Sequence, residues 1–196
     1  MWDEVVRDRG GSPVASLADA TDATDARLAG ARFVAVLCQD NDVLPAVAAV
    51  EPAQAAAYLT LGDTGPVVTR APAANHFLKR LHASGTDAYL LKSGRVGGAD
   101  PERSIEVTGD HAAAILDAIV AGTVEWERDP DFGYRVAAVV PGIEGRDRFL
   151  LLPRLLYART ERVYEHAALV PELRRERVEH LSALEGLDAT IVDAVR

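Results

Sequence analysis

Blocks of apolar and polar residues alternate along the chain in a pattern that predicts an α/β fold. Continuous apolar runs at Phe33–Cys38, Ala88–Leu91 and Val136–Val140 are typical of strands covered on both faces. Leu44–Val50 and Ser104–Val107 predict two further short extended segments. Segments with helical periodicity separate these runs, and this order favours a mixed or parallel sheet.

Three helices are predicted between the strands. Proline is tolerated in a first turn, so Pro52 can begin a helix that ends at Gly62. A second helix is expected over Asn75–Ser84, with Gly85 just past its end. The third follows Thr108, whose hydroxyl can cap it, and Gly122 ends it. Its apolar side chains form one stripe, made of Ala112, Ile115, Leu116, Ile119 and Val120.

The last quarter of the chain has a helical pattern. Thr160 can cap a helix over Glu161–Leu169. Pro171 can begin another helix, which continues through Leu184. Asp188 can cap a final short helix over Ala189–Val195.

We expect one domain without a linker. Residues 1–31 form an irregular N-terminal segment rich in Ala, Asp and Thr. Residues 32–154 form the α/β region, and residues 155–196 form a helical tail of the same domain.

Composition narrows the class of protein. The 196 residues are enough for a real core, and the net charge of −9 argues against nucleic-acid binding. No stretch approaches the apolar length of a membrane span, so no membrane association is expected. The single cysteine, Cys38, excludes an internal disulfide and fits a cytoplasmic protein.

The sequence contains no common catalytic motif that identifies an active site. No histidines lie at i,i+4 in a metal-binding motif, no serine has a nucleophile-elbow context, and nothing identifies a metal. Cys38 is interpreted as a small buried hydrophobe, and Asp129 and Asp131 as turn residues beside Pro130. Gly94, Gly97 and Gly98 do not make a phosphate-cradling loop.

Several segments resemble a known enzyme family in the order in which that family carries them. RDPDFGYRVAAVVPGIEGRDRFLLLPR, from Arg128 to Arg154, is the longest, and VLPAV, EPAQA and KRLHASGTDAYLLK precede it. Together they resemble the C-terminal, nucleotide-binding part of ATP-dependent phosphoenolpyruvate carboxykinases, which make phosphoenolpyruvate from oxaloacetate and ATP. The resemblance runs from about Arg32 to Arg154 and implies the corresponding α/β domain with a mixed sheet, followed by the helical tail.

The resemblance also implies a nucleotide site. Arg103 matches the family's nucleotide-binding arginine, Ser104 falls where the backbone contacts adenine, and Thr108 matches a following threonine. ATP is therefore the implied cofactor, bound weakly or vestigially, and an arginine can stack on a purine or pair with phosphate. The alternative interpretation gives these residues a structural role only: a surface arginine followed by a helix cap.

The family's phosphate-binding Gly-Lys-Thr loop and its metal ligands have no counterpart in this chain. We therefore expect the C-terminal portion of a carboxykinase-like protein that is inactive alone. Its expected partner is an N-terminal half, or another protein, that covers an exposed face of the sheet. The alternatives are a stand-alone binding or scaffolding module derived from that fold, whose helical tail meets a protein partner, and a truncated reading frame.

Overall fold

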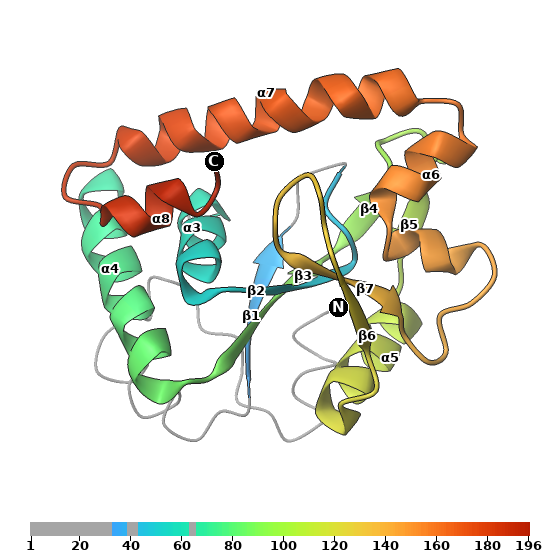
Figure 1. Ribbon diagram of the computed structural model, residues 1–196, viewed down its shortest axis with the longest axis horizontal. Coiled ribbons are helices and arrows are strands. Elements are labelled where there is room, and N and C mark those ends of the chain that lie inside the picture. Colours follow the sequence, from blue (N-terminus) through green and yellow to red (C-terminus); the bar gives the residue numbers. More distant parts are fainter. Residues whose placement is uncertain (1–32, 39–42, 63–65) are drawn as a thin grey trace.

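A five-stranded mixed sheet lies at the centre of the fold (Figure 1). The computed structural model describes residues 33–38, 43–62 and 66–196, so the expected N-terminal segment 1–31 lies outside the described residues. Strand order is β1-β3-β2-β7-β6, in which β1 and β3 are parallel and the other neighbours are antiparallel. The strands are β1 (Phe33–Cys38), β2 (Val47–Val50), β3 (Asp87–Lys92), β6 (Glu125–Arg128) and β7 (Arg135–Val139).

Helices cover one face of the sheet and build the larger core cluster, which includes Val36, Leu90 and Val136 from alternate strand positions. Because successive strand residues point to opposite faces, these side chains meet the helices while their neighbours face away. The helices are α3 (Pro52–Gly62), α4 (Val67–Ser84), α7 (Val163–Ser182) and α8 (Ala189–Asp193). Figure 1 shows α7 crossing the molecule, with α3, α4 and α8 under one end and α6 (Pro153–Arg159) under the other.

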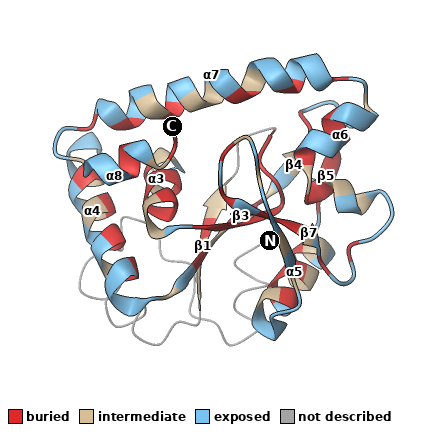
Figure 2. Ribbon diagram, viewed as in Figure 1, coloured by how far each residue is buried: buried red, intermediate tan, exposed pale blue. Residues whose placement is uncertain are grey.

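A second core cluster forms on the other side of the sheet around Leu91, Ile115 and Leu151. Here α5 (Gly109–Ala121), the 3-10 helix η2 (Asp147–Leu150) and α6 (Pro153–Arg159) pack with a separate two-stranded sheet. That sheet consists of β4 (Gly94–Val96) and β5 (Ile105–Val107). Figure 2 shows the buried sides of these elements facing inward. Strands β3 and β7 have buried residues on both faces, as their apolar runs predict. Among the described residues β1 is an edge strand and is mostly half-buried, so cover on both faces is not found there.

Most of the expected elements are confirmed, as is the mixed α/β architecture. Helix α4 is longer than expected: it begins at Val67 and contains Pro72, because Ala71 and Ala74 pack its first half against the core. Strand β6 was not predicted. Its sequence, EWER, belongs to a mostly exposed edge strand and lacks an apolar run.

Two expectations in the last quarter are wrong. Thr160 does not begin a helix; it lies at the end of α6, where its hydroxyl donates to the Leu156 carbonyl at 2.9 Å. Pro171 does not start a new helix, since it lies inside the continuous helix α7. Buried Val170 and Leu181 anchor α7 on both sides of the proline, so packing outweighs the lost backbone hydrogen bond.

The helical tail shares the core of the α/β region. Tyr157, Val170, Leu181 and Ile191 belong to the same buried cluster as the strand residues. Across the described ranges, no helix is both long enough and apolar enough to cross a bilayer.

Candidate functional site

An open hollow lies where η2, α6 and the β4–β5 turn meet. We call it the arginine hollow. It has a volume of about 630 Å³, within the range of about 300–1,000 Å³ typical of small-molecule sites. Its lining residues come from two regions distant in sequence, the β4–β5 turn and the stretch 145–160: Glu102, Gly145, Arg146, Phe149, Leu156, Arg159 and Thr160.

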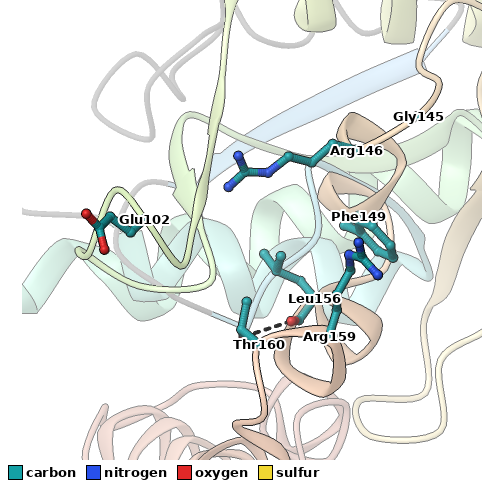
Figure 3. A pocket seen from close by; sticks show the side chains of 7 residues that line it. All are labelled: Glu102, Gly145, Arg146, Phe149, Leu156, Arg159 and Thr160. Carbon is teal, nitrogen blue, oxygen red and sulfur yellow. Dashed lines mark hydrogen bonds between the residues drawn. The ribbon is translucent and has the colours of Figure 1, made fainter.

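Positive charge gathers around one half-buried aromatic ring in this hollow. The guanidinium carbons of Arg148 and Arg159 lie 5.4 and 5.8 Å from the Phe149 ring centroid. Figure 3 shows the Arg146 guanidinium pointing into the space between η2 and the β4–β5 turn, while the Glu102 carboxylate is turned away from it. Within the described part of the chain, the Arg146 guanidinium has no hydrogen bond or ion pair. Its donors are therefore free to meet an anion.

Arg103, the first residue of the predicted site, is not among the lining residues of the hollow but contacts one of them, Thr160. Its Nη2 atom approaches the Thr160 carbonyl oxygen at 3.5 Å, across 57 positions of sequence. Its backbone N–H donates to the Asp100 carbonyl at 3.2 Å, which closes the β4–β5 turn. The structure thus places Arg103 against Thr160, a residue of the hollow that Arg146 and Arg159 also line.

Ser104, the second predicted residue, is buried and occupied by contacts within the turn. Its hydroxyl donates to the Asp100 carbonyl at 2.5 Å and accepts from Arg95 Nε at 2.7 Å. Its carbonyl oxygen accepts from Arg95 Nη2 at 3.4 Å. Ser104 shapes the turn that carries Arg103 and does not line the hollow.

Thr108, the third predicted residue, caps α5. Its side chain accepts from the backbone N–H of His111, and His111 Nδ1 accepts from the Thr108 N–H at 3.1 Å, a reciprocal capping box. His111 Nε2 lies 3.2 Å from Asp147 Oδ2 at the start of η2. Thr108 therefore reaches the hollow only through its helix and η2, and is not among the lining residues.

A second polar cluster lies beneath α7, on the far side of the sheet from α5. Arg177 donates to the Tyr58 hydroxyl at 2.8 Å, and its guanidinium lies 4.9 and 4.6 Å from the Tyr58 and Phe132 ring centroids. Burial raises the pKa of the nearby Cys38 thiol to about 11, only partly offset by Lys92 and Arg177. The thiol stays protonated at neutral pH, which argues against a nucleophile.

Sequence reasoning missed Arg146, Phe149 and Arg159 as site residues. The signal was present in RDRF, two arginines beside a phenylalanine, within the segment that carries the strongest family resemblance. That signal acquires meaning only when α6 and the β4–β5 turn are placed beside it.

The described residues contain no group of three or more His, Cys, Asp or Glu side chains suited to a metal ion. No protein-family model matches the chain, and no curated protein matches it.

Proposed function

We propose that the chain is a binding module for a phosphorylated ligand with a planar ring, an adenine nucleotide being the first candidate. The observation that carries the proposal is that Arg146 and Arg159 line the same hollow as Phe149, while Arg103 contacts Thr160 in its wall. The whole chain is acidic, with a net charge of −9. A local group of arginines beside a hollow departs from this overall charge and favours an anionic ligand.

The residues of the hollow fit the two halves of such a ligand. Guanidinium groups form charge-assisted, often bidentate hydrogen bonds with phosphate, and Arg146 has donors to spare. Phe149 offers a ring on which a base can stack, a contact worth about 1–3 kcal/mol per base in nucleic-acid complexes. Arg103, which contacts Thr160 in the wall of the hollow, can pair with phosphate or stack on a purine.

The resemblance to ATP-dependent phosphoenolpyruvate carboxykinases supports the nucleotide as first candidate, because the arginine that it singles out, Arg103, lies beside Thr160 of the hollow. On this proposal the chain corresponds to the C-terminal nucleotide-binding portion of a carboxykinase-like protein. A Gly-Lys-Thr loop is absent from the chain, so most of the affinity for a triphosphate is lost. We expect a dissociation constant on the order of 1 mM, about 4 kcal/mol of binding, and no formation of phosphoenolpyruvate by this chain alone.

The test is an affinity series for ATP, ADP, adenosine and pyrophosphate, measured by NMR titration of the wild type. Arg146→Gln and Arg159→Gln should each weaken ATP several-fold, and adenosine much less, because they remove phosphate partners. Arg175→Gln is the matched control, since Arg175 is an exposed α7 arginine paired only with Glu179 among the described contacts. Weakening by the control equal to that by the hollow variants would reduce the effect to general charge and reject the site.

The alternative function is a stand-alone module that binds another protein. Val163 and Tyr164 favour it, because they leave 55% and 91% of their surfaces exposed at the start of α7. The affinity series for ATP, ADP, adenosine and pyrophosphate distinguishes the two functions. A module that binds only another protein should bind ATP no more tightly than pyrophosphate or adenosine.

A further inference from the structure

We infer that Arg162 is the positioning residue of the arginine hollow. It fixes the β4–β5 turn, which carries Arg103, to the α6–α7 turn, which carries Thr160. The inference rests on the proposed function, because it assigns Arg162 a role in the binding of the same phosphorylated ligand without touching it.

Arg162 joins the two turns with separate nitrogen atoms. It is only 6% exposed. Its Nη2 donates to the Arg103 carbonyl at 2.7 Å, and its Nε donates to Thr160 Oγ1 at 3.0 Å. Its Nη1 pairs with Glu165 at 3.5 Å, and the guanidinium lies 4.3 Å from the Tyr157 ring centroid. The rigid fork of the guanidinium can therefore set the separation of the two turns.

The contacts between the turns form a closed circuit. Arg162 holds the Arg103 carbonyl, the Arg103 side chain reaches the Thr160 carbonyl at 3.5 Å, and the Thr160 hydroxyl accepts from Arg162. Thr160 also donates to the Leu156 carbonyl at 2.9 Å, which ties the circuit to α6. Thr160 and Leu156 line the hollow, so a change at Arg162 reaches the wall of the hollow directly.

Gly97 provides the space for this arrangement. Its φ is +94°, and a Cβ atom there would lie 2.6 Å from Leu156 Cδ2, 3.2 Å from the Arg103 carbonyl oxygen and 3.3 Å from Arg162 Nη2. The glycine in the loop after β4 thus permits close approach of Arg162 and α6. This gives Gly97 a role that does not require it to cradle phosphate.

The experiment compares Arg162→Met and Arg162→Lys with Arg177→Met as matched control. Arg177 lies on α7, which begins directly after Arg162; it is also 6% exposed and also stacks on a tyrosine, but it contacts Tyr58 instead of either turn. ATP affinity is measured by NMR titration, with the folded fraction of each variant determined at the same temperature. Amide hydrogen exchange is measured over residues 97–104.

Both Arg162 variants should bind ATP about tenfold more weakly, because lysine keeps the charge but not the fork that reaches both turns. Arg177→Met should bind like the wild type once the folded fraction is taken into account. Equal weakening by Arg177→Met, or full affinity in Arg162→Lys, would overturn the inference.

Failure of the proposed function has a different signature. If the wild type binds neither ATP nor pyrophosphate, the proposed function is wrong. The positioning role of Arg162 is then tested by hydrogen exchange alone. Faster exchange over residues 97–104 in Arg162→Met, but not in Arg177→Met, would support that role. Unchanged exchange in Arg162→Met would reject it.

Discussion

Replacing Gly97 by alanine should destabilise the chain by about 3 kcal/mol. Backbone strain and steric overlap of the new Cβ atom both contribute to this loss. A non-glycine residue in left-handed backbone costs roughly 1–2 kcal/mol, and Gly97 has a φ of +94°. The added Cβ would also lie 2.6 Å from Leu156 Cδ2 and 3.2 Å from the Arg103 carbonyl oxygen. Overpacking of this kind costs typically about 1–3 kcal/mol.

Gly122→Ala is the control that carries the backbone cost alone. Gly122 has a φ of +68°, and nothing lies within 4 Å of the position of its Cβ. A chain of this size loses about 2–4 °C in melting temperature per kcal/mol. Thermal unfolding should therefore show a loss of roughly 9 °C for Gly97→Ala and roughly 4 °C for Gly122→Ala. Equal losses in the two variants would refute close packing at Gly97, and with it the space that Arg162 needs.

Three further outcomes are expected. Thr108→Ala should cost about 1 kcal/mol of stability by removing the cap of α5 but leave the dissociation constant of ATP unchanged; weaker binding would restore Thr108 to the site. Burial raises the pKa of Cys38 to about 11, so at pH 7 roughly one thiol in ten thousand is ionised, and a thiol reagent should label the folded chain, in which Cys38 is only partly buried, far more slowly than the urea-unfolded chain. Burial lowers the pKa of His166 from its usual 6.5, against an opposing effect of Asp131. The unfolded state therefore takes up this proton first as the pH falls below about 6.5, so stability is lost there, and His166→Gln should flatten the difference in urea stability between about pH 7.5 and 5.5. A parallel pH dependence in the variant would show that His166 is not the group responsible.

Local signals sufficed for much of the fold. The apolar runs of β1, β3 and β7 and the glycines after α4 and α5 act through neighbouring residues, so the sequence alone predicts them. The helix starts predicted at Thr160 and Pro171 are wrong because tertiary packing outweighs local preference. Helix α7 stays continuous through Pro171, since Val170 and Leu181 are buried. The exposed edge strand β6 carries no apolar run that could have identified it.

The candidate site was predictable only in part, for the same physical reason. Arg103 was found through a resemblance of local segments. Arg146, Phe149 and Arg159 join it only because the chain returns to the β4–β5 turn, with Thr160 meeting Arg103 across 57 positions of sequence. Contacts of that separation leave no periodicity in the sequence.

The aromatic NMR signals of Phe149 test the central claim most directly. The chain has four phenylalanines, so one substitution assigns the ring of interest. Titration with ATP should shift the Phe149 signals, through stacking of the base, and leave Phe132 beneath α7 unchanged; pyrophosphate should shift Phe149 less. Saturable shifts confined to Phe132, or no shift at Phe149 when ATP is well above about 1 mM, would contradict a nucleotide site in the arginine hollow.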